Sequence, residues 1–221
     1  MADSRWDRLA LLAGVAFVLM FVVGYVVTTA AGDAPGDKAT AEEMLAYYVN
    51  DSASAGIGAY LWTLSAVPFL WFLASLRSTL RAVEGASGRL STAALAGGIA
   101  GIALLVVSAA TNFGAIFIAD DDNLTAEAAQ ALFTLGLTAF LAAFLFMGIM
   151  AGATAIVALR TRLLPKWIAW TGLVIAIGLL TPAVFFVFFL FLVWIVVLSV
   201  ALYRRGAAPE PAAAETPTTP T

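Results

Sequence analysis

Residues 167–203 read WIAWTGLVIAIGLLTPAVFFVFFLFLVWIVVLSVALY, and these 37 residues include no Asp, Glu, Lys or Arg. A single helix of that length would measure about 55 Å, nearly twice the ~30 Å thickness of the hydrocarbon core of a bilayer. Thr181-Pro182 lies inside the stretch. Proline removes one backbone donor and drives the preceding residue out of the α-helical region, so a turn is expected there. The stretch therefore predicts two membrane spans, at about 165–181 and 183–203.

Four further runs without charged residues bring the predicted number of spans to six: residues 9–32, 52–76, 90–119 and 128–159. Each is long enough for the ~20 helical residues that cross the hydrocarbon core. The predicted fold is an all-α, polytopic six-helix bundle over residues 1–205, with spans at about 9–31, 56–76, 91–118, 130–159, 165–181 and 183–203. The Ala/Pro/Thr-rich tail, residues 206–221, has nothing to bury and is expected to be disordered in the cytoplasm.

The composition supports a membrane protein and argues against several other classes. Of the 221 residues, 62% are hydrophobic and 11% are charged, whereas soluble domains are about half apolar and about a quarter charged. The 11 basic residues do not outnumber the 14 acidic ones, which argues against nucleic-acid binding. The chain has no Cys and no His, so disulfides and the usual haem and zinc ligands are absent. We expect no cofactor.

The distribution of charge predicts the orientation of the bundle. With both termini in the cytoplasm, ten of the eleven basic residues fall on the cytoplasmic side, where Lys and Arg near span ends are enriched. Lys38 is the exception, and nine of the fourteen acids fall in the outer loops. The first run also has the small residues Thr29-Ala30-Ala31 of a signal-peptide cleavage site, but it exceeds the apolar region of ~7–15 residues typical of such peptides. We expect it to remain as a span.

The first outer loop contains a predicted helix of its own. Thr40 and Glu43 have the spacing of a capping box, in which each side chain accepts a hydrogen bond from the other residue's backbone N–H. Met44, Leu45 and Tyr48 follow at helical spacing, which predicts a short amphipathic helix on the outer membrane surface. This helix either acts as a lid over a cavity that opens outward or rests its apolar face on lipid or on the bundle.

Pairs of small residues predict where helices approach closely. Gly97 and Gly101 in the third span, and Gly148 and Gly152 in the fourth, have the four-residue spacing of membrane helix contacts. Both pairs lie in the cytoplasmic halves of their spans. We therefore expect the two pairs to meet across antiparallel neighbouring helices.

The final hairpin carries two further expectations. Few polar residues follow Thr181, so its turn should pack beneath an outer-loop segment near Tyr47 or Asp120, because backbone groups freed at a turn need partners. Phe residues occur all around the predicted last span, 183–203. That distribution is typical of a helix that faces lipid.

The spans lack the residues that most membrane chemistry requires. Apart from Lys166 at the cytoplasmic start of the fifth, no predicted span contains a charged residue, whereas ion- and proton-coupled carriers usually keep one at membrane depth. Intramembrane proteases need Ser with His, paired Asp or a metal site, and none can be assembled from these residues. We therefore expect a protein that is not an enzyme.

Two groups of polar residues remain as candidate sites. The first lies toward the outer half of the third span and comprises Ser108, Thr111 and Asn112. It either binds a ligand or forms hydrogen bonds to a neighbouring helix. The second follows the second span on the cytoplasmic side and comprises Arg77, Arg81 and Arg89. It either contacts anionic lipid headgroups or simply reflects the usual enrichment of basic residues on that side.

One motif has a family resemblance. The sequence Leu164-Pro165-Lys166-Trp167-Ile168-Ala169-Trp170-Thr171-Gly172 resembles the start of the fifth span in a family of small bacterial membrane proteins of unknown function. The order of features over most of residues 9–205 is also similar, including Phe69-Leu70-Trp71-Phe72-Leu73 in the second span. The resemblance implies a six-helix fold and no particular activity. Abundant Ala, and nine Arg against two Lys, suit a GC-rich bacterial genome.

These observations lead to two hypotheses for function in a bacterial plasma membrane. The first is a non-enzymatic protein, either an accessory subunit or a binder of lipid or another hydrophobic ligand. The second is a small carrier or channel, acting alone or as an oligomer. The expected partners are membrane lipids and a membrane protein or a second copy of the chain, with no nucleic acid. A polar cavity at Asn112 would favour the carrier, and a solid core with a flat apolar flank would favour the accessory subunit.

Overall fold

The computed structural model describes residues 3–30, 35–36, 39–50, 52–85, 87–120, 123–181 and 184–206. All regular secondary structure in these residues is helical, so the all-α prediction is confirmed for the described part of the chain. The seven helices are α1 Asp3–Ala30, α2 Ala41–Asn50, α3 Ser52–Glu84, α4 Arg89–Asp120, α5 Ala126–Thr161, α6 Lys166–Gly178 and α7 Val184–Gly206.

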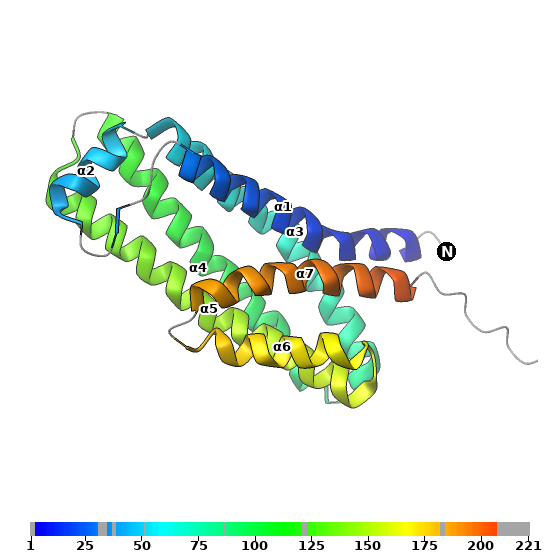
Figure 1. Cartoon of the computed structure of the whole chain (residues 1–221). Coiled ribbons are helices and arrows are strands. Elements are labelled where there is room, and N and C mark those ends of the chain that lie inside the picture. The colour runs from blue at the N-terminus through cyan, green and yellow to red at the C-terminus, as the bar shows by residue number, and fades with distance from the viewer. Residues whose placement is uncertain are drawn as a thin grey trace, which may run out of the picture.

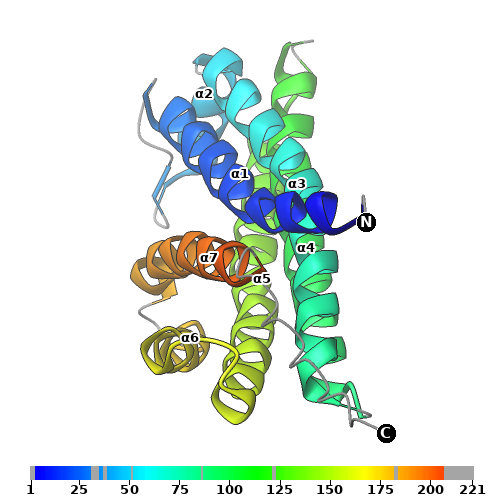
Figure 2. The ribbon, with the colours of Figure 1, turned by 90° about the vertical axis from the view of Figure 1, so that its right-hand side faces the viewer.

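Six of these helices form a ring in the order of the chain (Figure 1). α1 packs on α3, α3 on α4, α4 on α5, α5 on α6 and α6 on α7, and α7 packs back on α1. The seventh helix, α2, lies at one end of the ring and packs on α3, α4 and α5. Figure 2 shows that α6 and α7 are inclined to α3, α4 and α5.

Five helices, α1, α3, α4, α5 and α7, are long and apolar enough to cross a membrane. By helix length and hydropathy, the chain is a multi-pass membrane protein. α6 differs, because its 13 residues make about 20 Å of helix, less than the ~30 Å hydrocarbon core. The sequence predicts a span over 165–181, but residues 179–181 form a turn that is as apolar as the helix before it.

The long helices extend past the ends of the predicted spans. α3, α4 and α5 have 33, 32 and 36 residues, or about 48–54 Å of helix each. Uncharged runs mark only the apolar section of each helix, whereas the helices continue through polar flanks such as Arg77 to Glu84. At the other end of the chain, α7 includes Gly206, and residues 207–221 of the predicted disordered tail lie outside the described residues.

The chain turns between α6 and α7, so the predicted break in the 37-residue stretch is confirmed. Backbone groups in the turn are paired locally. The N–H of Leu180 donates to the carbonyl of Ile177 and that of Thr181 to the carbonyl of Gly178, both at 3.0 Å. Pro182 lies outside the described residues.

The prediction that an outer-loop segment covers this turn is wrong. Thr181 is exposed, and α2, which contains Tyr47, packs on α3, α4 and α5. The physical reason is the shortness of α6, which leaves the turn beside the middle of α5. Phe185, just after the turn, contacts Phe140, which lies about 21 Å from the start of α5.

The glycine pairs of α4 and α5 face different neighbours. A Cβ on Gly97 would lie 2.7 Å from a backbone carbonyl oxygen of α5, so α4 and α5 are in backbone contact there. A Cβ on Gly148 would lie 3.2 Å from a backbone carbonyl oxygen of α6. The prediction that both pairs meet at one crossing is therefore wrong: Gly97 and Gly101 face α5, whereas Gly148 and Gly152 face α6.

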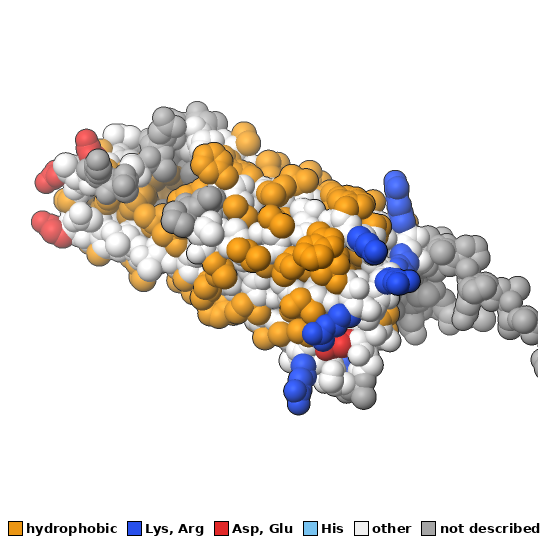
Figure 3. Space-filling view, turned by 60° about the horizontal axis from the view of Figure 1, so that its bottom comes forward, with side chains coloured by type: hydrophobic (Ala, Val, Ile, Leu, Met, Phe, Trp, Pro, Cys, Tyr) orange, Lys and Arg blue, Asp and Glu red, His pale blue; other side chains and the backbone are white. Residues whose placement is uncertain are grey.

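Charge separates along the bundle (Figure 3). Most Lys and Arg side chains gather where α3, α5 and α7 end and α4 and α6 begin, which we call the basic end. Acidic side chains mark the opposite end, the acidic end, where α2 lies and α5 begins. Exposed hydrophobic side chains cover the surface between the two ends, as expected for a surface that faces lipid.

The capping box of α2 is confirmed. The backbone N–H of Thr40 donates to Oε2 of Glu43 at 2.8 Å, and the backbone N–H of Glu43 donates to Oγ1 of Thr40 at 3.3 Å. The apolar side of α2 packs on the bundle, where Met44 and Tyr48 are buried in a cluster that includes Ala115 of α4. α2 is therefore a packed element of the acidic end.

Candidate functional site

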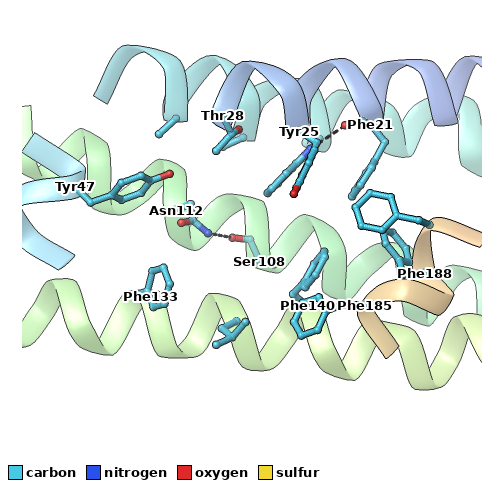
Figure 4. A pocket seen from close by; sticks show the side chains of 15 residues that line it. Phe21, Tyr25, Thr28, Tyr47, Ser108, Asn112, Phe133, Phe140, Phe185 and Phe188 are labelled. Carbon is cyan, nitrogen blue, oxygen red and sulfur yellow. Dashed lines mark hydrogen bonds between the residues drawn. The ribbon is translucent and has the colours of Figure 1, made fainter. Parts of the chain in front are cut away.

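A cavity of about 260 Å³ lies in the half of the bundle nearer the acidic end (Figure 4). Of the fifteen described residues that line it, nine are aromatic and none is charged. They come from every helix except α6 and are Phe21, Tyr25, Thr28, Tyr47, Ala55, Ala59, Trp62, Ser108, Asn112, Phe133, Leu137, Phe140, Phe185, Phe188 and Phe189. Such a lining is typical of a site for a hydrophobic ligand.

The cavity opens on the side of the bundle. Tyr25 of α1 and Phe185 and Phe189 of α7 line it and are also 42%, 49% and 47% exposed. The rings of Tyr25 and Phe189 meet edge to face with centroids 5.8 Å apart, so these side chains form the rim between α1 and α7. Because the surrounding surface is apolar, the opening faces the region where lipid chains would lie.

The cavity results from the position of the α6–α7 turn. α7 begins beside Phe140 of α5, whose ring centroid is 6.4 Å from that of Phe185 and 5.8 Å from that of Phe188. Beyond this point, toward the acidic end, the described part of the ring has neither α6 nor α7 between α1 and α5. The space left there is the cavity, with the three Phe side chains as its floor (Figure 4).

The wall formed by α1 and α3 is held by a close crossing. A Cβ on Gly58 would lie 2.9 Å from the carbonyl oxygen of Gly24, so the two backbones touch. One turn further on, the indole N–H of Trp62 donates to the carbonyl of Phe21 at 3.1 Å, and the two rings stack with centroids 5.4 Å apart. Trp62 is thereby fixed as a flat wall of the cavity.

Asn112 lies on the cavity wall and also ties α2 to α4. Its Oδ1 accepts a hydrogen bond from the phenol of Tyr48 at 3.0 Å, and its Nδ2 donates to the carbonyl of Ser108 at 2.8 Å. Gly136 of α5 makes room for this arrangement, since a Cβ there would lie 3.1 Å from Nδ2 of Asn112. The side chain therefore contributes both to helix packing and to the cavity lining.

The chemical state of Tyr48 fixes the direction of its bond to Asn112. Burial of the side chain, and next the neighbouring Tyr47, raise the pKa of the Tyr48 phenol above its ordinary value. The phenol therefore stays protonated and donates its hydrogen to the Asn112 oxygen. The Asn112 nitrogen is then left to donate to the Ser108 carbonyl, which only accepts.

The first group of predicted site residues is divided by the structure. Ser108 and Asn112 line the cavity, one helical turn apart on α4. Thr111 is not among the described lining residues, and its hydroxyl donates to the Ser108 carbonyl at 2.8 Å. Within the described residues, no group of three or more His, Cys, Asp or Glu side chains is placed to hold a metal ion.

The second group, Arg77, Arg81 and Arg89, is exposed at the basic end, far from the cavity. Arg81 lies over Gly88, whose φ of +53° allows the tight turn between α3 and α4. The nearby carboxylate of Glu84 accepts hydrogen bonds from two backbone N–H groups at the start of α4. At the basic end, the turn between α3 and α4 is thus capped by Glu84 and has a basic surface.

The sequence did not identify the aromatic lining. The Phe-rich last span was expected to face lipid, but Phe188 and Phe191 are 3% and 0% exposed, whereas Phe186 is 84% exposed. The expectation holds for one side of α7 only. The spacing of Phe185, Phe188 and Phe189 along one helical face was the available signal, and Phe at neighbouring positions obscured it.

Of three comparisons with known proteins, the one with protein families finds a match. Neither the curated proteins nor the solved structures include a match to this chain. The family described as a domain of unknown function, DUF4386, matches residues 12–202, which include all of the cavity lining. The chain belongs to the DUF4386 family.

Proposed function

We propose that this protein binds a hydrophobic ligand, such as the chain of a membrane lipid, in the cavity between α1, α5 and α7. The observation that supports this function best is the cavity itself, with aromatic walls and a sideways opening. Its volume of about 260 Å³ exceeds the ~150 Å³ of an engineered apolar cavity that binds benzene, so it has room for a larger molecule.

The character of the walls favours a binder of hydrophobic molecules over a carrier or channel for polar solutes. Polar solutes need several hydrogen-bonding or charged groups along their path, whereas nine of the fifteen described lining residues are aromatic. A solid core with a flat flank would have favoured an accessory subunit, and a cavity with a lateral opening argues for a ligand. We propose that the protein is not an enzyme.

The proposed setting is a bacterial plasma membrane with six helices embedded and both termini in the cytoplasm. The segregation of ten of the eleven basic residues supports this orientation. The chain has no Cys, so labelling of a single introduced thiol reports directly on the orientation of the chain in the membrane. Ser87→Cys should be protected from an impermeant thiol reagent in intact cells, and Asn123→Cys should be labelled. The opposite pattern would invert the orientation.

The binding function can be tested by filling the cavity. Leu137 lines the cavity, and Leu141, one turn further along α5, is 39% exposed and is not among the described lining residues. Leu137→Trp should lower uptake of radiolabelled decane about tenfold or more, because the indole occupies the space of the ligand. Leu141→Trp is the matched control and should bind decane like the wild type.

Uptake is measured with purified protein in phosphatidylcholine nanodiscs, and the decane held by protein-free nanodiscs is subtracted. Native mass spectrometry of the protein extracted from membranes provides a second measurement, in which a hydrophobic molecule should accompany the wild type and Leu141→Trp. Wild-type protein that takes up no decane above the protein-free level would overturn the proposed function. Unchanged uptake by folded Leu137→Trp would exclude this cavity as the site.

A further inference from the structure

The cavity has a polar part and an apolar part. Figure 4 shows Asn112 beside Tyr47 toward α2, whereas Phe140 and Phe188 lie toward α7. Ser108 lies between them, one turn from Asn112 on the same helix. A molecule that fills the cavity would therefore meet aromatic rings along most of its length and hydrogen-bonding groups near α2.

The polar part has hydrogen-bonding capacity to spare. An Asn amide has two N–H donors and an oxygen with two lone pairs. Asn112 uses one donor on the Ser108 carbonyl and one lone pair on the Tyr48 phenol, which leaves one of each. The Ser108 side chain adds a hydroxyl to the same part of the cavity wall, and the residue is only 4% exposed.

The described part of the lining provides nothing to neutralise a charge. None of the fifteen described lining residues is Asp, Glu, Lys or Arg. Moving an ionised carboxylate, phosphate or ammonium group into such a site is costly, since no partner of opposite charge compensates for the lost hydration. A hydroxyl or carbonyl group loses far less hydration. A hydroxyl can bond to both the donor and the acceptor that remain on Asn112, whereas a carbonyl can accept a hydrogen bond from the remaining donor.

We propose that the cavity selects an uncharged amphiphile, a hydrocarbon chain that ends in a hydroxyl or carbonyl group. This inference rests on the proposed function and specifies its ligand. The chain lies against Trp62, Phe140 and Phe188, and the polar end bonds to Asn112 and Ser108. Neutral lipids with one polar end have this chemistry, whereas phospholipid headgroups and fatty-acid anions do not.

The test compares ligands with the same chain length and different ends. Binding of decane, 1-decanol, methyl decanoate, decanoate and decyltrimethylammonium is measured in phosphatidylcholine nanodiscs, at equal mole fraction in the membrane. The wild type should bind 1-decanol, methyl decanoate or both about fivefold more tightly than decane, the gain expected from one neutral hydrogen bond. Tighter binding of 1-decanol would indicate a ligand with a hydroxyl end, and tighter binding of methyl decanoate a ligand with a carbonyl end. Both ions should bind more weakly than decane.

Three variants locate the polar contact. Asn112→Leu should bind 1-decanol and methyl decanoate no more tightly than decane, because the remaining donor and acceptor are lost. Ser108→Ala leaves the Asn112 amide in place, and it should reduce the preference for 1-decanol or methyl decanoate over decane. Tyr48→Phe removes the internal hydrogen bond to Asn112 without changing a described lining residue, so it should keep the full preference.

The outcomes separate this inference from the proposed function. If decane binds and neither neutral amphiphile binds more tightly, the ligand is a plain hydrophobic chain and only this inference is overturned. Tight binding of either ion by the wild type would also overturn it. If decane itself does not bind, the proposed function fails with it. The comparison among ligands needs only the wild type, so a variant that does not fold leaves the test intact.

Discussion

The two halves of the bundle are built differently, although the same long helices run through both. Helices touch backbone to backbone in both halves, at Gly97 of α4 and at Gly58 of α3, but toward the basic end the interior is filled by side chains such as Phe72 and Met147. Toward the acidic end, the interior contains the cavity around Asn112. We call the close-packed half toward the basic end the solid half, and the half that contains the cavity the hollow half.

The difference follows from the length of the last hairpin. α6 has 13 residues, so the chain turns back beside the middle of α5 and α7 closes the ring only on the basic side. The acidic side has α2 across its end instead. The comparison teaches that a membrane bundle can form a cavity by shortening one hairpin, without any charged residue among the described residues of its lining.

The largest expected effect comes from removing a ring in the solid half. Phe72 is fully buried, and its ring lies 6.0 Å from that of Phe69. Phe72→Ala should lower the free energy of unfolding by about 3–5 kcal/mol, because it leaves a void among close-packed side chains. Phe133→Ala, in the half-buried cavity wall, should cost about 1 kcal/mol. Unfolding in mixed detergent and SDS micelles measures the free energy of unfolding of both variants. Equal losses would contradict the view that one half is close-packed and the other contains a cavity.

The next effect compares two glycines of α4. A Cβ on Gly97 would lie 2.7 Å from a backbone oxygen and 2.9 Å from a backbone nitrogen of α5, and neither atom can move without moving the helix. Gly97→Ala should therefore destabilise the protein by about 1–3 kcal/mol. Gly114, toward the acidic end, has nothing within 4 Å of its would-be Cβ, so Gly114→Ala should be neutral or stabilising. Thermal unfolding in detergent distinguishes the two, and a stable Gly97→Ala would show that the crossing is loose.

A smaller effect is expected at the turn that closes the solid half. The Glu84 carboxylate accepts hydrogen bonds from the backbone N–H groups of Leu90 at 2.7 Å and Ser91 at 2.8 Å. Glu84→Gln replaces one acceptor oxygen with a donor and removes the charge, so it should cost about 1–2 kcal/mol. Glu127→Gln, at the exposed start of α5, is the control and should change stability little. The same unfolding assay measures both, and equal effects would contradict the capping role.

Much of the fold is readable from the sequence because membrane spans have a strong signal. The uncharged runs predict the long helices, Thr181-Pro182 predicts the turn, and Thr40 with Glu43 predicts the start of α2. The short length of α6 is not readable in the same way. Leu179 and Leu180 belong to the turn and are as apolar as the helix, so hydropathy gives no sign of its end.

The site is readable only in its polar part. Asn112 stands out because an amide is rare among apolar residues, and Ser108 is singled out with it. The aromatic walls give no such signal, since Phe has the same hydropathy whether it faces lipid, like Phe186, or the interior, like Phe188. Distinguishing the two requires knowing where α7 begins relative to α5, which depends on tertiary packing.

The smallest expected effect concerns the closure of the hollow half by α2. The Tyr48 phenol donates to Asn112, and this bond joins α2 to the cavity wall. Tyr48→Phe keeps the buried ring and removes the bond, so α2 should detach more often while the rest of the bundle is unchanged. A neutral hydrogen bond contributes about 1 kcal/mol, which corresponds to about fivefold faster amide hydrogen exchange in α2. Exchange in α6, which packs on α5 and α7 in the solid half, should not change.

Hydrogen exchange followed by mass spectrometry provides the measurement, with peptides that cover residues 41–50 and 166–178. Tyr60→Phe is the control, because Tyr60 is 58% exposed on α3 and is not a described lining residue, and it should leave both peptides at the wild-type rate. A ligand that fills the cavity should slow exchange in α2, since Tyr47 of that helix lines the cavity. If Tyr48→Phe leaves α2 as protected as in the wild type, then packing of Met44 and the tyrosine rings, rather than the bond to Asn112, holds α2 in place.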